Sequence, residues 1–323
     1  MAGLALCLLL LASPIASAAP TAAGLRQQLE RLNAQADQAV EQYLQAKLAL
    51  QQTNSAIAAL KGRAGQDRQQ VEQLKSAVAA QAADTYVHGA GAGIASVLTA
   101  GDPDAAFDRI ETLSVLARHN SGQLADLDVA EQTYQQGLAA LEKVQRRQAA
   151  ELDRLAGRKA RVERLVDQTK SLLSQLQAQA ASRQAGGDSG VDPGLPATAA
   201  PPLPAGGGGV AAVIRYAQAQ VGKPYVWGAD GPGSFDCSGL TMKAWAQAGL
   251  SLPHSAAAQS TIGRRVSRSE LQPGDLIFRY SPISHVAMYV GGGLQIAATH
   301  TGSTVKLQDA FQGPIVGYSR PNG

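Results

Sequence analysis

The sequence predicts a long α-helical coiled-coil hairpin followed by an α+β domain. Residues 25–81 repeat apolar side chains at the alternating three- and four-residue spacing of a coiled coil. From residue 210 onward, short apolar runs alternate with Gly and Pro turns, which is typical of short strands and helices. A stretch rich in Gly, Pro and Ala separates the two patterns, and such a composition cannot build a packed core. The 323 residues therefore divide into segments of different architecture.

Residues 1–18 resemble a secretory signal peptide. The apolar run 4–12 is followed by Ala16-Ser17-Ala18, the small-residue pattern that precedes a cleavage site. The start of the segment lacks the usual positive charge. An uncleaved membrane anchor, the alternative, needs about 20 apolar residues, and this run is shorter. We therefore expect an exported protein.

Residues 19–183 form the predicted coiled-coil region. In 25–81, fourteen of sixteen heptad core positions are apolar, with Thr53 and Asp67 as the exceptions. A second run, 110–176, keeps the spacing with more polar core positions. The Gly-rich segments 88–93 and 101–104 predict a turn, which favours an antiparallel hairpin over parallel self-association. His88 and His119 have no second ligand at metal-binding spacing.

Residues 184–209 are the predicted linker, and 210–323 the predicted α+β domain. We expect helices over 210–220 and from Ser238, with strands at 275–278, 285–290, 294–298 and 315–318. This domain carries nine Lys or Arg against five Asp or Glu. The basic balance suits an anionic target. No Lys/Arg run with interleaved aromatic residues indicates nucleic-acid binding.

Cys237 is the only cysteine that an exported form keeps, because Cys7 lies in the signal segment. A lone thiol in an exported protein is an intermolecular bridge, a buried bystander or a nucleophile. Gly and polar residues flank Cys237 at the start of the predicted helix. There the helix dipole should lower the pKa of the thiol, and backbone N–H groups can stabilise an oxyanion. This pattern favours the nucleophile.

A cysteine nucleophile needs a base, and His254, His285 and His300 share its domain. His285 begins a predicted strand, so its ring can face a cleft while the following residues alternate into the sheet. It can take the thiol proton and later deliver it to the leaving amine. His254 is predicted to be a surface residue at a helix entry that borders the substrate. No HExxH, CxxC or phosphate-binding Gly motif predicts a metal or an organic cofactor.

Four motifs in this order resemble the NlpC-type family of papain-like cell-wall peptidases. They are Tyr225–Gly228, Phe235–Leu240, Pro273–Leu276 and Ser284–Gly291. The long coiled coil resembles the N-terminal region of Gram-positive peptidoglycan hydrolases that carry this domain. The resemblance implies a papain-like fold that cleaves peptidoglycan stem peptides between D-glutamate and the following diamino acid.

The same resemblance implies roles for individual residues. Cys237 would be the nucleophile and His285 the base. Tyr225 would lie beside the thiol and help the oxyanion, while Asp236 and Ser238 would help hold the free amino end of the stem peptide.

One position departs from the family pattern. A third polar residue usually stands twelve positions after the catalytic histidine, but here that position is Ala297. Gln295 shares the strand face of Ala297, and His300 can serve if the strand has already turned. The alternatives are a simple Cys237–His285 dyad with a weaker base, or a domain that binds wall peptides without efficient turnover.

We therefore expect a secreted, wall-associated cysteine endopeptidase of peptidoglycan that acts through a thioester. The coiled coil is predicted to be a regulatory or docking arm that covers the cleft or binds a membrane or divisome regulator. The alternatives are a wall-binding or scaffolding protein, and an amidase or acyltransferase on the same fold.

Overall fold

The computed structural model describes residues 21–88, 90–184 and 208–323. The chain forms two compact units, one of residues 45–157 and one that joins the segment up to Leu44 with the segment from Arg158 to the end. The predicted signal peptide 1–18 and most of the predicted linker 184–209 lie outside the described residues.

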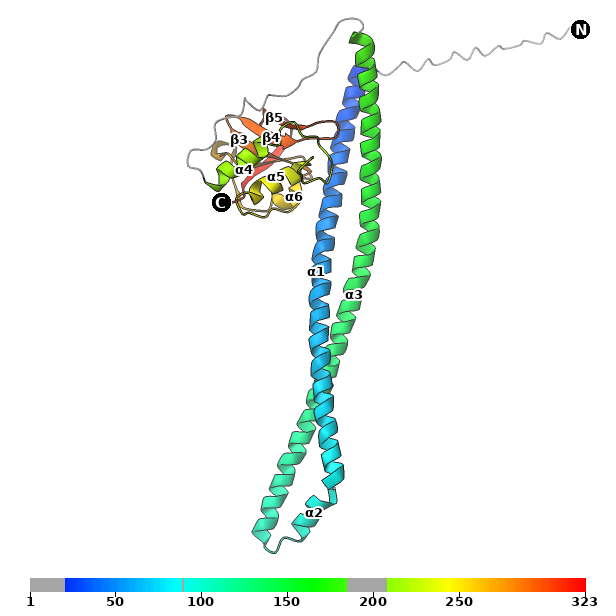
Figure 1. The fold of residues 1–323 in the computed structure, drawn as a ribbon, viewed down its shortest axis with the longest axis vertical. Coiled ribbons are helices and arrows are strands. Elements are labelled where there is room, and N and C mark those ends of the chain that lie inside the picture. The colour runs from blue at the N-terminus through cyan, green and yellow to red at the C-terminus, as the bar shows by residue number, and fades with distance from the viewer. Residues whose placement is uncertain (1–20, 89, 185–207) are drawn as a thin grey trace, which may run out of the picture. The chain divides into compact units, whose positions relative to one another are not determined.

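Residues 45–157 consist mainly of parts of two long helices, α1 (Ala22–His88) and α3 (Pro103–Gln184). The two helices lie side by side and run antiparallel (Figure 1), and Thr53 Oγ1 donates a hydrogen bond to Glu151 at 2.9 Å. The buried α1 residues of this unit are all predicted heptad core positions: Ile57, Ala64 and Val71. The predicted apolar stripe is therefore the shielded face of α1.

The turn between α1 and α3 differs from the prediction. Residues 90–98 form a third helix, α2 (Ala90–Leu98), so the expected Gly-rich loop at 88–93 is mostly helical. A glycine costs only about 1 kcal/mol in a helix, and the apolar residues that follow favour continuation. The chain turns at 99–102, which agrees with the second predicted turn segment, 101–104. Pro103 begins α3, where its missing N–H has no helical acceptor to lose.

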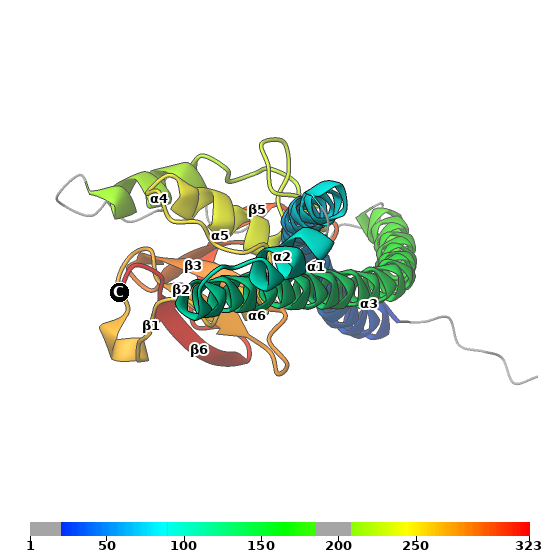
Figure 2. The ribbon, with the colours of Figure 1, turned by 90° about the horizontal axis from the view of Figure 1, so that it is seen from below.

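The C-terminal domain contains an antiparallel sheet in the order β1-β6-β2-β3-β4-β5. Helices α4 and α5 lie together on one side of it (Figure 2). The helices and the 3₁₀ turn η2 are α4 (Gly209–Gln218), α5 (Cys237–Ala246), α6 (Ala256–Gln259) and η2 (Arg268–Glu270). The strands are β1 (Arg264–Arg265), β2 (Leu276–Arg279), β3 (His285–Gly291), β4 (Leu294–Ala298), β5 (Val305–Asp309) and β6 (Ile315–Arg320). This confirms the predicted α+β domain.

The domain has a core of its own. Trp245 and Leu240 of α5 pack with Val286 and Met288 of β3 in a cluster whose members all lie between residues 210 and 307. A smaller cluster on the opposite face of the sheet includes Ala287. Since neither cluster needs a residue of α1 or α3, we expect residues 209–323 to fold alone.

The structure confirms the four predicted strands, which are β2, β3, β4 and β6. The sequence analysis missed β5, although Val305, Leu307 and the intervening polar residues alternate as a half-buried strand requires. It also missed β1, because two residues are too short to show a period.

The ends of α1 and α3 belong to the same unit as this domain. Val40 and Leu44 of α1 pack with Val162 and Val166 of α3. Trp227 joins this cluster and meets the ring of α1 residue Tyr43 edge-on, with ring centroids 5.3 Å apart. Within the described part of the chain, no helix carries an apolar stretch of the length that a membrane span requires.

Candidate active site

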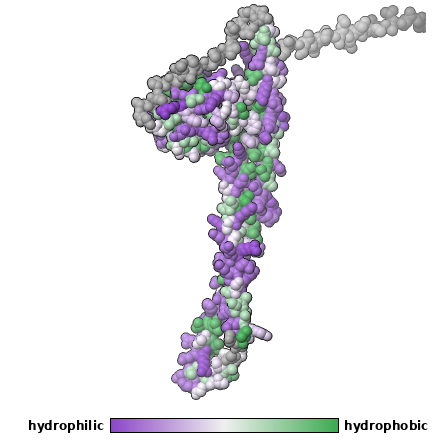
Figure 3. All heavy atoms as spheres, in the orientation of Figure 1, coloured by the Kyte–Doolittle hydropathy of each residue, from purple (hydrophilic) through white to green (hydrophobic). Residues whose placement is uncertain are grey.

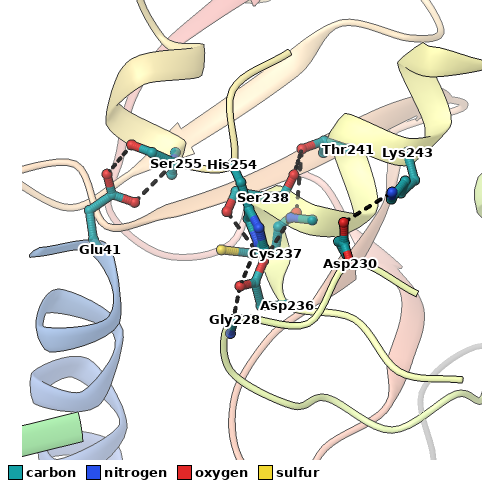
Figure 4. Close-up of polar contacts among 12 residues, drawn as sticks. Glu41, Gly228, Asp230, Asp236, Cys237, Ser238, Thr241, Lys243, His254 and Ser255 are labelled. Carbon is teal, nitrogen blue, oxygen red and sulfur yellow. Dashed lines mark hydrogen bonds and ion pairs between the residues drawn. The ribbon is translucent and has the colours of Figure 1, made fainter. Parts of the chain in front are cut away.

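Cys237 is the first residue of α5, as predicted, and the preceding residue caps the helix. The Asp236 carboxylate accepts a hydrogen bond from the backbone N–H of Gly239 at 2.7 Å, which satisfies one of the free donors of the first turn (Figure 4). Gly239 also lets the preceding loop approach, because a Cβ there would stand 2.3 Å from the carbonyl oxygen of Ala229. The cap and this close approach fix the direction of the thiol-bearing turn.

Asp236 is fully buried and accepts several hydrogen bonds besides the cap. The donors are the Gly228 N–H at 2.8 Å, the Ser238 hydroxyl at 3.2 Å and the Nε2 atom of His254 at 2.8 Å. A carboxylate has about four acceptor sites, so these bonds and the cap occupy them. Asp236 therefore holds the loop, the helix and His254 together, and its contact with a substrate amine stays a prediction.

His254 does not lie on the surface as expected. Its side chain is 17% exposed and pairs with the buried carboxylate of Asp236 (Figure 4). Ser255 caps the short helix α6, and the backbone turn before that helix directs His254 toward α5. The surface prediction was wrong because this pairing joins residues 18 positions apart, which no local pattern reports.

His285 begins β3, as predicted, and lies opposite Arg279 of β2. Its side chain is buried, and the backbone N–H of the next residue, Val286, donates to Cys237. The backbone at the start of β3 thus reaches the thiol of α5, one residue after the predicted base.

The electrostatics at Cys237 contradict one expectation. Burial raises the pKa of the Cys237 thiol, and the carboxylates of Asp236 and Asp37 raise it further. The helix N-terminus contributes only about 0.3–1 kcal/mol, so desolvation and two nearby anions outweigh it. The predicted lowering of the thiol pKa was therefore wrong for this arrangement.

His285 is held neutral as well. Burial lowers the pKa of His285 to about 3, with Arg279 and then His300 adding to the effect. The shifts of both groups thus favour their neutral forms, the thiol and the imidazole.

Tyr225 is buried near the thiol, as the resemblance implied. The pKa of Tyr225 is raised well above its usual range by burial, with Asp37, Cys237 and Asp236 adding to the effect. Ser238 is also buried, and its hydroxyl donates to Asp236, so it supports that carboxylate.

Ala297 is buried in β4, and neither proposed substitute bonds to His285. Gln295 accepts a hydrogen bond from Arg279 Nη2 at 2.9 Å. His300 lies after the end of β4, in the turn, and its Nδ1 atom lies 3.0 Å from the carbonyl oxygen of Thr301. No hydrogen bond between the described residues reaches the His285 ring. His300 lines the same cavity as His285, and its orienting role stays a prediction.

Two acidic residues of α1 reach this site, and the sequence analysis missed both. Asp37 is buried, and its pKa is raised well above the usual range by burial and by Asp236. Glu41 accepts hydrogen bonds from the Ser255 hydroxyl and from the backbone N–H groups of Ala256 at 2.9 Å and Ala257 at 3.2 Å (Figure 4). Asp37 and Glu41 are one helical turn apart in the sequence. In a heptad pattern, acidic residues at this spacing are typical of a solvent-exposed helix face, so no sign of the contact was visible in the sequence.

Among the described residues, no group of three or more His, Cys, Asp or Glu side chains is arranged to hold a metal ion.

Comparisons with known proteins agree with the motifs. The NlpC/P60 family profile matches residues 222–316. A probable endopeptidase of Mycobacterium tuberculosis, Rv2190c, is 32% identical over 325 residues, which cover 86% of this chain and 84% of that protein. The probable endopeptidase p60 of Listeria seeligeri is 48% identical over 92 residues, covering 28% of this chain and 18% of that protein.

Among solved structures, the crystal structure of the P60 domain of the Mycobacterium avium subspecies paratuberculosis antigen MAP1204 is similar. It is 29% identical, with a TM-score of 0.34, and the match covers 36% of this chain and 96% of that one. With the thiol, the histidine and the family motifs in one domain, the chain belongs to the NlpC/P60 family of probable endopeptidases.

Proposed function

We propose that this chain is a cysteine endopeptidase that hydrolyses peptidoglycan stem peptides between D-glutamate and the following diamino acid. The observation that carries the proposal is the position of the Cys237 thiol, at a capped helix N-terminus and at the start of the strand that carries His285. Acyl transfer by a thiol needs a base in the same site that can take its proton, and His285 begins the strand whose backbone reaches Cys237.

In the first half of the reaction, the neutral His285 ring accepts the thiol proton as the sulfur attacks the γ-carbonyl carbon. The resulting oxyanion lies near the first turn of α5, where the Cys237 N–H has no intrahelical acceptor, and near the Tyr225 hydroxyl. The imidazolium then returns its proton to the leaving amine, and a thioester remains on Cys237.

In the second half, His285 takes a proton from water, whose oxygen attacks the thioester carbon. Collapse of the second oxyanion breaks the carbon–sulfur bond, and the sulfur recovers the proton from His285. Tyr225 acts in both halves, because each passes through an oxyanion at the same place.

The proposal predicts a specific product. Residues 209–323 should release a stem-peptide fragment from muropeptides, detected by mass spectrometry, and Cys237→Ala should release none. The fragment mass identifies the bond, which also separates a peptidase from an amidase. Absence of product from the folded domain, with muropeptides still bound, would contradict the proposal and favour a wall-binding module.

We further propose that the first part of α1 regulates access to Cys237. In what we call the closed arrangement, residues 30–44 of α1 lie against the domain. Three contacts support it: the Glu41 bonds to the start of α6, the Tyr43–Trp227 ring contact and the buried Asp37 carboxylate. Asp37 and Glu41 both raise the pKa of the Cys237 thiol, which opposes its ionisation.

A regulator would then have to move α1. Figure 3 shows apolar atoms near the end of the helical pair that carries α2, where Ile94, Leu98 and Phe107 are more than half exposed. Such a surface suits docking of a membrane or divisome partner. We propose secretion to the wall on the basis of the signal-peptide pattern in residues 1–18.

A further inference from the structure

One face of the sheet lines a cavity of about 410 Å³ beside His285. Strand pairing puts Arg279 opposite His285, Gln308 opposite Gln295 and Lys306 opposite Ala297. Directly paired residues project to the same face, so polar side chains from β2 to β5 converge there.

Arg279 is a buried cation in the wall of this cavity. It is 6% exposed, and its Nη2 atom donates to Gln295 at 2.9 Å and to the Ala310 carbonyl at 3.0 Å. Its Nη1 atom lies at Gly313, another cavity residue, where a Cβ would stand 3.3 Å away. Among the described residues, no carboxylate lies within salt-bridge distance of the guanidinium. Buried charges are normally paired, so this cation points to an anionic ligand.

Lys306 adds a second positive charge to the cavity, and His300 lines it as well.

The cavity lies on the leaving-group side of the bond to be cleaved. A general acid must touch the amine that it protonates, and His285 is a cavity residue. Cys237, Tyr225 and Asp236, which serve the acyl side, are not among the residues that line it. The fragment that departs with the new amine therefore extends toward Arg279.

We propose that this cavity is the subsite for the leaving fragment and that Arg279, supported by Lys306, recognises a carboxylate on it. The inference rests on the proposed peptidase function and names the substrate chemistry on the departing side. In the closed arrangement, Glu30 and Asp37 of α1 form part of the opposite wall. They place acidic groups where the substrate carboxylate binds, so α1 and substrate compete for the cavity.

The test uses L-Ala-γ-D-Glu-diaminopimelate peptides with both diaminopimelate carboxylates free, or with either one converted to an amide. Residues 209–323 are compared as wild type, Arg279→Gln, Lys306→Gln and the control Arg215→Gln, which removes an exposed charge on α4. Binding of free diaminopimelate and its amides is measured separately by NMR titration of the Arg279 Nε–Hε resonance in the wild type.

We expect the wild type and Arg215→Gln to prefer one free carboxylate by about tenfold or more in kcat/KM, since charge-assisted bidentate bonds are strong. Arg279→Gln should bring the acid-to-amide ratio close to one. Lys306→Gln should lower it about threefold, which tests the cavity even if Arg279→Gln does not fold.

Turnover with the same kcat/KM on acids and amides would overturn the inference and leave the peptidase proposal intact. Absence of turnover, with carboxylate-dependent binding at Arg279, would overturn the peptidase proposal and support the subsite. Unchanged ratios in both cavity variants would also overturn the inference.

Discussion

Glu41→Gln tests whether α1 restrains Cys237. Glu41 is 4% exposed and accepts hydrogen bonds from Ser255, Ala256 and Ala257 at the start of α6. A glutamine keeps the shape but loses the charge and one acceptor oxygen, and it brings an amide group toward backbone donors. The closed arrangement should therefore weaken while the domain itself stays folded.

The magnitude follows from these bonds. A hydrogen bond to a charged group contributes about 1.5–3 kcal/mol, and a neutral one about 1 kcal/mol. Loss of one acceptor and of the charge should destabilise the closed arrangement by about 2–3 kcal/mol, which shifts the closed-to-open ratio by about 30- to 150-fold. The Cys237 thiol also leaves the neighbourhood of two α1 carboxylates, so its pKa should fall.

The assay is alkylation of Cys237 by neutral iodoacetamide in the full chain, followed by intact-protein mass spectrometry, with muropeptide turnover measured in parallel. Residues 209–323, which lack α1, give the alkylation and turnover rates expected when nothing covers Cys237. The full chain with Glu41→Gln should approach these rates. Glu72→Gln, an exposed change on the same helix, is the matched control and should behave as the wild type. Equal alkylation and turnover in the full chain, Glu41→Gln and the isolated domain would refute restraint by α1.

Three further predictions concern the site. The pKa of Asp37 is raised in the closed arrangement, so its protonated form stabilises that arrangement. This contribution is complete at pH values below the ordinary aspartate pKa, and it is lost as the pH rises through the raised pKa. Asp37→Asn should therefore raise the free energy of unfolding of the full chain, measured in urea, by more at pH 7 than at pH 4. An equal increase at both pH values would contradict this prediction. Gly239→Ala should cost about 2–3 kcal/mol in the urea unfolding of residues 209–323, since the new Cβ meets Ala229 at 2.3 Å. Gly233→Ala, with nothing within 4 Å, is its control and should change stability by less than about 0.5 kcal/mol. Tyr225→Phe should lower kcat about 10- to 100-fold with little change in KM, because the proposed mechanism places its hydroxyl at the oxyanion. An unchanged kcat would remove Tyr225 from the mechanism.

Elements with strong local signals were predictable from the sequence. The heptad stripe of α1 identified its shielded face, and apolar runs between Gly and Pro turns located β2, β3, β4 and β6. The Gly-rich segment 88–93 was wrongly predicted to be part of the turn. Glycine alone does not end a helix when the residues that follow favour helix formation.

The candidate site was predictable to the extent that its chemistry sits in short motifs. Cys237 and His285 could be named because a lone cysteine at a helix start and a histidine at a strand start are each local features. His254 was misplaced, and Arg279 was counted only as a charge, because their partners lie far away in the sequence.

The sequence by itself determined the family, and it predicted Cys237 as the nucleophile and His285 as the base, since these depend on residue types at fixed spacing. Only the tertiary structure decided the direction in which the pKa values of Cys237 and His285 are shifted. A pKa depends on burial and on charges within a few ångströms. Apart from Asp236, which precedes Cys237 in the sequence, the charged or titratable residues that shift the pKa values of Cys237 and His285 come from α1, β2 and the turn after β4. The acidic side chains of Asp37 and Glu41 acquire a role for the same reason: folding brings them to a thiol about 200 positions away in the chain, where a low dielectric makes each charge count.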